Sequence, residues 1–204
     1  NIFDDNKIIL LRDPIISVKN IKSTIHQKLD QKIQNQKYIL GIGRLTAQKN
    51  FVLLLEFFAE LNKKYPEYKL YILGEGEDRI LLNSIINKYE LGSKAYLLGY
   101  QENIFKYLRH AECFILSSLW EDPGFVLIEA GAMNTNIISS NCPNGPKEII
   151  NNEDFLFSSN SSNDLLQKFE IFKKKSASEL LRQKINIKKK NKILYFFSTF
   201  QKFK

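Results

Sequence analysis

Two glutamates with seven residues between them, Glu121 and Glu129, lie in the otherwise apolar stretch SLWEDPGFVLIEA. Valine, leucine, isoleucine and alanine surround the second, so its position is not typical of a surface acid. A carboxylate in such surroundings needs hydrogen-bond partners, and vicinal hydroxyls, such as those of a ribose, suit its two oxygens. The first glutamate could accept from a second hydroxylated ring. Alternatively, Glu121 is a solvated loop acid and Glu129 is favoured by a helix dipole.

The turn between the two glutamates offers backbone amides as a second kind of contact. Pro123 and Gly124 turn the chain, and a helix is expected to begin near Phe125. The amides of Gly124, Phe125 and Val126 would point outward with partial positive charge, so a phosphate or a hydroxyl-rich ring could rest there.

A third group could hold phosphate through side chains. Arg44 and Lys49 lie in the polar segment RLTAQKN, directly after an apolar run that ends at Gly43. Arginine offers a planar fork of donors and lysine a compact charge, and both suit a diphosphate. The alternative is that both are solvated surface charges.

Other ligand chemistries lack their signatures. GIGRLT and GEGEDR lack the third glycine of a dinucleotide fingerprint, and no Gly-Lys-Ser/Thr of a P-loop occurs. Cys113, Cys142 and the two histidines are not at metal-ligand spacing, so no metal site is expected. Cys113 is expected to pack inside a strand, and so low a cysteine content fits a reducing cytosol.

Six short apolar runs, alternating with segments of helical spacing, must position these residues. Such runs indicate parallel strands buried on both faces and joined by right-handed crossovers. The predicted fold is α/β, a doubly wound, Rossmann-like parallel sheet of about six strands with a C-terminal helical tail. Ligands bind outside the carboxyl ends of such strands. The runs are 37–43, 68–74, 95–99, 113–118, 136–140 and 154–158.

Two helix ends can be assigned from local signals. Asn50 is a plausible N-cap for a helix over residues 51–65, which Pro66 would end. Gly92 is expected to close the helix that begins near residue 78.

The net charge of +8 is concentrated at one end of the chain. From Lys173 to Lys204, ten lysines and one arginine oppose one glutamate, a net of +10, so the remainder sums to −2. The body is therefore not a basic nucleic-acid surface. Aromatic residues of the tail, among them Phe196 and Phe200, recur at helical spacing and predict an amphipathic helix. This helix would pack on a preceding domain or lie on an anionic membrane surface.

The segments GRLTAQKN, LYILGEGED, LLGYQENI, CFILSSLWEDPGFVLIEAGA and NGPKEII together resemble the donor-binding half of family 4 retaining glycosyltransferases with the GT-B architecture, over roughly residues 10–175. The resemblance implies that three charged residues are catalytic, through contacts to the donor diphosphate or the transferred sugar: Arg44, Lys49 and Glu121. It implies that six further residues bind the donor through its ribose, base, sugar or phosphates: Glu129, Gly124, Phe125, Val126, Tyr100 and Gly43.

Two loops depart from the family pattern. Many members have Gly-Phe-Gly after the first glutamate, whereas residues 122–125 here are Asp-Pro-Gly-Phe, a variant associated with surface polysaccharide assembly. Asn144 and Gly145 stand where a glycine pair is frequent. Neither change removes a charged contact.

The resemblance also implies an activity for the whole protein. A sugar would pass, with retention of configuration, from a nucleotide-sugar, with a UDP-sugar favoured, to a glycan or lipid-linked acceptor in surface polysaccharide or lipopolysaccharide assembly. No Asp-x-Asp motif is present, so neither a metal nor another cofactor is expected. The alternatives are a nucleotide-sugar-binding fragment or pseudoenzyme without transfer activity and a sugar-nucleotide epimerase.

The expected organisation has three parts. Residues 1–36 would be a linker from an acceptor-binding domain that is missing from this chain, so that the isolated chain would be inactive. Residues 37–175 would form the nucleotide-sugar-binding domain, and 176–204 the basic amphipathic helix. Neither a signal peptide nor a run of about 18 apolar residues occurs. We therefore expect a cytoplasmic protein, with peripheral contact to the cytosolic face of the inner membrane if the tail is interfacial.

Overall fold

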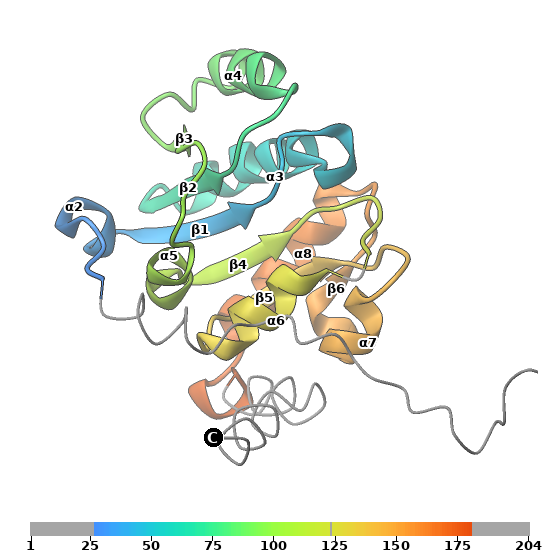
Figure 1. The fold of residues 1–204 in the computed structure, drawn as a ribbon. Coiled ribbons are helices and arrows are strands. Elements are labelled where there is room, and N and C mark those ends of the chain that lie inside the picture. Colours follow the sequence, from blue (N-terminus) through green and yellow to red (C-terminus); the bar gives the residue numbers. More distant parts are fainter. Residues whose placement is uncertain (1–26, 123, 181–204) are drawn as a thin grey trace, which may run out of the picture.

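The computed structural model describes residues 27–122 and 124–180 of the 204-residue chain. They form a six-stranded, entirely parallel sheet in the order β3-β2-β1-β4-β5-β6 (Figure 1). This order confirms the predicted doubly wound fold. The strands are β1 (Lys37–Ile42), β2 (Tyr68–Leu73), β3 (Ala95–Leu97), β4 (Cys113–Leu116), β5 (Ile137–Ser140) and β6 (Leu156–Phe157).

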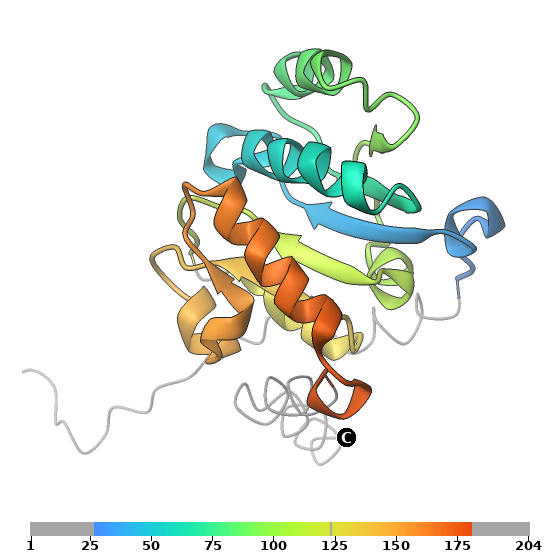
Figure 2. The same cartoon turned by 180° about the vertical axis from the view of Figure 1, so that it is seen from behind.

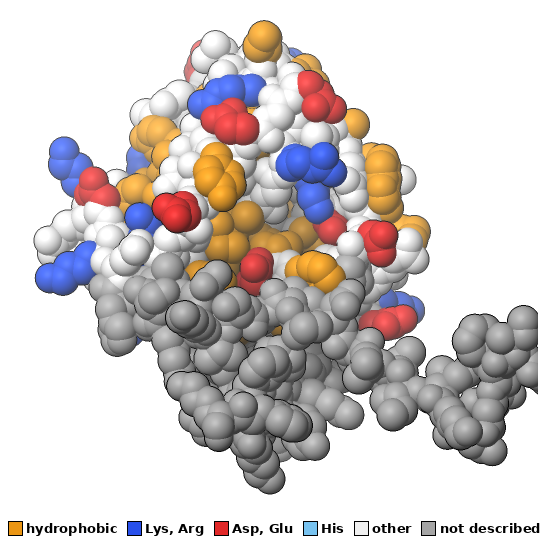
Figure 3. Space-filling model, viewed as in Figure 1, with side chains coloured by type: hydrophobic (Ala, Val, Ile, Leu, Met, Phe, Trp, Pro, Cys, Tyr) orange, Lys and Arg blue, Asp and Glu red, His pale blue; other side chains and the backbone are white. Residues whose placement is uncertain are grey.

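Helices connect the strands and cover both faces of the sheet. In Figure 2, α3 and α8 lie side by side in front of the sheet, and in Figure 1 α5 and α6 lie in front of the opposite face. On that second face, hydrophobic side chains gather at the centre with acidic and basic side chains around them (Figure 3). The helices are α2 (Gln31–Gln34), α3 (Phe51–Lys64), α4 (Arg79–Lys88), α5 (Phe105–His110), α6 (Phe125–Ala132), α7 (Pro146–Ile150) and α8 (Ser162–Lys174), with the 3₁₀ turns η2 (Ala47–Lys49) and η3 (Glu153–Phe155).

The strands coincide with the six predicted apolar runs because those runs are buried between the helix layers. In β4 all four residues are at most 2% exposed, including Cys113 as predicted. Burying a leucine, isoleucine or phenylalanine side chain contributes about 2 kcal/mol, so the centre of the sheet is strongly determined. The sixth run gives only the two residues of β6, because η3 occupies its start.

Helix α3 begins where predicted and ends one residue early, and Asn50 is its N-cap residue as predicted, although without the side-chain bond of a cap. Leu54, Phe57, Phe58 and Leu61 follow helical spacing, and each is 0% exposed. Asn50 holds the cap position in a left-handed conformation (φ 50°), yet its side chain makes no cap hydrogen bond. Its Nδ2 instead donates to the carbonyl of Ser159 at 3.1 Å, so a distant loop outcompetes the local cap.

The predicted end of α4 is wrong. The helix ends at Lys88, and Glu90 rather than Gly92 adopts the left-handed conformation that follows it (φ 55°). The amide of Leu91 then donates to the carbonyl of Ile86 at 2.8 Å, and this bond stabilises the turn without a glycine.

The two ends of the described region bear on the predicted domain organisation. Helix α2 lies within the segment predicted as a linker. Residues 177–180 are helical, and Ser176 and Glu179 cap each other's amides at 3.3 and 2.8 Å, as a capping box does. The rest of the predicted tail helix and the predicted linker strand lie outside the described residues. Within the described part of the chain, no helix is long and apolar enough to cross a membrane.

Candidate functional site

The predicted site residues gather where the direction of the sheet's connections changes. Strands β1 and β4 are neighbours, with Ile39 opposite Cys113 and Leu40 opposite Phe114. From β1 the chain moves outward through β2 to β3, and from β4 it moves outward the other way. In such sheets a crevice opens outside the carboxyl ends of the two central strands. The loops that follow them, residues 43–50 and 117–124, hold most of the predicted residues.

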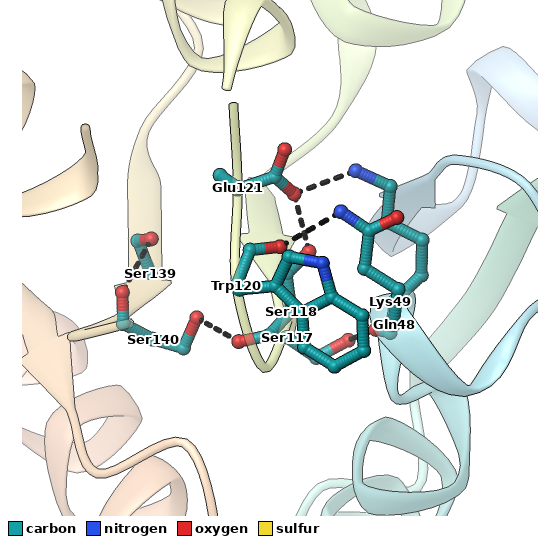
Figure 4. Close-up of polar contacts among 8 residues, drawn as sticks. All are labelled: Gln48, Lys49, Ser117, Ser118, Trp120, Glu121, Ser139 and Ser140. Atoms are coloured by element: carbon teal, nitrogen blue, oxygen red, sulfur yellow. Dashed lines mark hydrogen bonds and ion pairs between the residues drawn. The ribbon is translucent and has the colours of Figure 1, made fainter. Parts of the chain in front are cut away.

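Lys49 and Glu121 are bonded to each other between these two loops (Figure 4). The distance from Lys49 Nζ to Glu121 Oε1 is 2.6 Å. Glu121 is 4% exposed, and the Lys49 side chain is 16% exposed. The family resemblance implies that the two residues contact different parts of a ligand, and in the structure they hold each other as a charge-assisted pair.

Gly43 lies directly under the Lys49 side chain. A Cβ atom at Gly43 would be 3.0 Å from Lys49 Cγ, 3.1 Å from Cδ and 3.2 Å from Cε. A Cβ there would therefore require the lysine stem to shift by a few tenths of an ångström. The predicted site glycine thus directs the lysine toward Glu121.

Two further glycines pack the loop after β2 against the loop that carries Arg44. A Cβ at Gly74 (φ 134°) would be 1.9 Å from the Gly43 carbonyl oxygen, and one at Gly76 would be 2.3 Å from the carbonyl oxygen of Leu45. The amide of Leu45 donates to the carbonyl of Glu75 at 2.9 Å. The glycines of GEGED therefore allow the backbones of two loops to touch. This packing role explains why glycines occur there although the segment does not have the dinucleotide-binding pattern.

Arg44 and Tyr100 are exposed at the loops that follow β1 and β3. The Arg44 carbonyl accepts from the Thr46 amide at 2.9 Å, but the Arg44 side chain has no hydrogen bond or ion pair to the other residues that the structure describes. Tyr100 is 77% exposed. Both side chains are free to meet a ligand.

Three buried serines hold the Lys49–Glu121 pair, and sequence analysis did not single them out (Figure 4). Ser118 Oγ donates to Glu121 Oε1 at 2.5 Å, and Ser117 Oγ donates to the Lys49 carbonyl at 2.7 Å. Ser140 Oγ, from the end of β5, donates to the Ser118 carbonyl at 2.6 Å. The signal that could have indicated them is the pair of serines at the end of CFILSS and of IISS, because a hydroxyl buried at a strand end needs a hydrogen-bond partner.

A clamp joins the same two loops beside the ion pair. Gln48 Nε2 donates to the carbonyl of Trp120 at 3.0 Å, and the Leu119 amide donates to the carbonyl of Gln48 at 2.8 Å. Trp120 is 49% exposed, and its indole lies beside Gln48 (Figure 4). The clamp fixes the loop after β4 on both sides of this indole.

Helix α6 begins directly after the loop of Glu121, as predicted. Gly124 is in the left-handed region (φ 80°), which glycine adopts at low cost. The Leu127 amide bonds back to the Gly124 carbonyl at 3.0 Å. The amides of Phe125 and Val126 precede this first intrahelical bond, so the helix leaves them for another acceptor. Pro123 lies outside the described residues.

Glu129 lies in α6 in a partly buried position, as its surroundings in the sequence predict. Burial raises the pKa of its carboxyl group. Its carboxylate has neither a hydrogen bond nor an ion pair with other described residues. A partly buried acid without a partner is suited to accept from the hydroxyls of a ligand.

The loop before α7 adopts two consecutive positive φ angles without the glycine pair that is frequent in the family. Asn144 and Gly145 both have positive φ, 64° and 120°. Asparagine is among the residues that tolerate the left-handed region, so the departure from the family pattern leaves the loop conformation accessible.

Among residues 27–122 and 124–180, no three His, Cys, Asp or Glu side chains are grouped so that they could hold a metal ion.

The chain is similar in sequence to a known family of enzymes. Residues 22–192 match the family model described as glycosyl transferases group 1. The chain is 39% identical over 140 residues to an uncharacterized glycosyltransferase of Methanocaldococcus jannaschii, covering 67% of this chain and 34% of that protein.

A second relative is the Campylobacter jejuni N-acetylgalactosamine-N,N'-diacetylbacillosaminyl-diphospho-undecaprenol 4-alpha-N-acetylgalactosaminyltransferase. The chain is 34% identical to it over 119 residues, covering 58% of this chain and 32% of that protein. The chain thus spans about a third of the length of both relatives.

Solved structures share the fold. The chain superposes on the pneumococcal O-GlcNAc transferase GtfA, crystallised in complex with UDP and GlcNAc, with a TM-score of 0.68 and 20% identity. The match covers 84% of this chain and 37% of that one. The sheet and its helices therefore have the Rossmann-like fold of GT-B structures, as the sequence predicts.

Proposed function

Because this chain belongs to the group 1 glycosyl transferases, we propose that it forms the nucleotide-sugar-binding half of a retaining glycosyltransferase. The whole protein would transfer a sugar from a UDP-sugar to a glycan or lipid-linked acceptor in surface polysaccharide or lipopolysaccharide assembly, with the acceptor held by a preceding domain. The Lys49–Glu121 pair carries the proposal. It joins the two loops at the switch point of the sheet, which also carry or precede an arginine side chain and a partly buried carboxylate without described partners.

The diphosphate of the donor would bind to Arg44, Lys49 and the first amides of α6. Negative charge accumulates on this diphosphate as its bond to the sugar breaks, so cations and oriented amides stabilise the transition state more than the ground state. Lys49 can share its three ammonium donors between Glu121 and a phosphate oxygen. In this proposal the leaving group needs no metal ion.

The two carboxylates would bind hydroxyls on either side of the diphosphate. Glu129 would accept from the ribose, since its carboxylate is partly buried and has no described partner. Glu121 receives both of its bonds on Oε1, and its other oxygen points away from Lys49 (Figure 4). That oxygen would accept from the transferred sugar. Tyr100 would lie near the base, and Gly43 keeps Lys49 within reach of the diphosphate.

Two of the similar proteins support this substrate class. The Campylobacter relative is named for a diphospho-undecaprenol acceptor, which supports a lipid-linked acceptor here. The pneumococcal structure contains UDP, which supports uridine as the base. A cytoplasmic location, with the basic tail contacting the cytosolic face of the inner membrane, is part of the same proposal.

Isothermal titration of the chain with UDP, GDP and ADP tests the donor site. We expect UDP to bind, and failure of all three to bind at millimolar concentration would overturn the proposal. Transfer is tested on the complete protein with UDP-sugars and acceptors, with the anomeric configuration of the product read by NMR. Donor binding without transfer would favour a nucleotide-sugar-binding protein instead.

A further inference from the structure

A row of buried hydroxyl groups leads from β5 to the Glu121 carboxylate. We propose that Ser118 is a positioning residue that orients Glu121 toward the sugar of a bound donor, with Ser140 supporting Ser118 from the neighbouring strand. This inference rests on the proposed function and assigns to two serines the selectivity for a sugar-bearing nucleotide over the bare nucleotide.

The geometry at Glu121 carries the first step. Ser118 Oγ and Lys49 Nζ both donate to Oε1, at 2.5 and 2.6 Å. An ammonium on a flexible four-carbon stem fixes a distance but leaves the carboxylate free to rotate. A second donor, on a buried residue just beyond β4 whose carbonyl is bonded to Ser140, removes that freedom. The outcome is a carboxylate with one oxygen fixed by the protein and the other pointing away from Lys49 (Figure 4).

The placement of Ser118 carries the second step. Ser118 is 0% exposed and lies two residues after the end of β4, so its hydroxyl cannot exchange its bond to Glu121 for one to solvent. Ser140, also 0% exposed, donates to the Ser118 carbonyl and fixes the backbone from which the hydroxyl projects. The preceding residue, Ser117, holds the Lys49 carbonyl. One dipeptide therefore holds both members of the ion pair.

Ser139 supplies a matched control on the same strand end. It is 0% exposed like Ser118 and Ser140, but its hydroxyl donates to the Ser140 carbonyl at 3.0 Å and not to the Glu121 loop. Ser139→Ala thus measures the cost of losing a buried hydroxyl in this layer. Any additional effect of Ser118→Ala measures the orientation of Glu121.

The test is isothermal titration of the 204-residue chain with UDP, UDP-glucose, UDP-N-acetylglucosamine and UDP-N-acetylgalactosamine. The readout is the ratio of affinities for UDP and for the UDP-sugar that the wild-type chain binds most tightly. We expect Ser118→Ala to weaken binding of that UDP-sugar about tenfold, because a hydrogen bond to a charged group is lost, and to change UDP binding by less than about twofold. Ser139→Ala should leave the ratio unchanged, and Ser140→Ala should shift it less than Ser118→Ala, in the same direction.

Each other outcome has a distinct meaning. Equal losses for UDP and the UDP-sugar in Ser118→Ala, or a ratio equal to that of Ser139→Ala, would overturn the positioning role while leaving the proposed function intact. The positioning role is also overturned if the wild-type chain binds UDP but binds none of the UDP-sugars with an affinity that differs from that for UDP. If the wild-type chain binds none of the four, the proposed function fails and the inference with it. If circular dichroism shows that Ser118→Ala does not fold, Ser140→Ala decides by the same ratio.

Discussion

Glu121 and Glu129 belong to one strand–loop–helix unit, yet the protein surrounds their carboxylates differently. Glu121 receives an ammonium group and a buried hydroxyl on one oxygen. Glu129 has no described partner, and burial raises the pKa of its carboxyl group. The difference shows that the protein orients one carboxylate before any ligand arrives and leaves the other to obtain its partners from a ligand. Three substitutions, ordered by their expected effect on stability, test this contrast.

Lys49→Ala should have the largest effect. It leaves the Glu121 carboxylate, 4% exposed, without its ammonium partner, and removing one member of a buried pair costs about 3 kcal/mol of unfolding free energy. Urea unfolding followed by circular dichroism measures this loss. The control is Lys49→Met combined with Glu121→Gln, which removes both charges and should recover most of the stability. A double variant no more stable than Lys49→Ala would show that the ion pair is not what holds these loops.

Glu129→Gln should have a smaller effect of the opposite sign. Between the ordinary pKa of 4.5 and the raised pKa of Glu129, the folded chain binds more protons than the unfolded chain, so stability falls as pH rises through this window. The neutral variant escapes this loss. We expect it to unfold at higher urea concentration than the wild type at pH 7, with the advantage disappearing below pH 4.5.

Binding of UDP should reverse the order of stability of the wild-type chain and the Glu129→Gln variant. Under the proposed function, UDP supplies ribose hydroxyls to the ionised Glu129, so saturating UDP should stabilise the wild-type chain more than Glu129→Gln. Equal stabilisation of both by UDP would argue against a ribose contact at this residue.

Arg44→Ala should change stability least, by less than about 0.5 kcal/mol, because the side chain is exposed and has no described partner. It should nevertheless weaken UDP binding by about 1.5 kcal/mol, the value of a hydrogen bond to a charged group. Titration calorimetry measures the binding, and Lys63→Ala on α3 is the control for loss of a surface cation. If the two variants bind UDP equally well, Arg44 is an ordinary surface charge.

The strands and helices were predictable because their burial repeats along the sequence. The four apolar residues of α3 at helical spacing are all inaccessible, and six continuous apolar runs become six strands. Predictions that depended on one side chain's partner were less secure. Asn50 was assigned as a cap from its type and position, but its amide bonds to a carbonyl 109 residues away. No local pattern contains that competitor.

The same limit separates what could be predicted of the site from what could not. Residue types and loop positions indicated Arg44 and Glu129, because an exposed cation and an acid in an apolar helix turn are each informative alone. The bond between Lys49 and Glu121 joins residues 72 positions apart and exists only because β1 pairs with β4. The role of Ser118 was hidden, since a serine at a strand end looks the same whether it bonds to a backbone or to a carboxylate.

Trp120 gives the molecule a built-in optical signal. It is the chain's single tryptophan, held by the clamp to Gln48 with about half of its surface exposed, next to Glu121. All indole emission therefore originates at one place, the loop that carries Glu121. A ligand that covers the ring or changes the polarity around it would alter the intensity or wavelength of that emission, without any dye or engineered label.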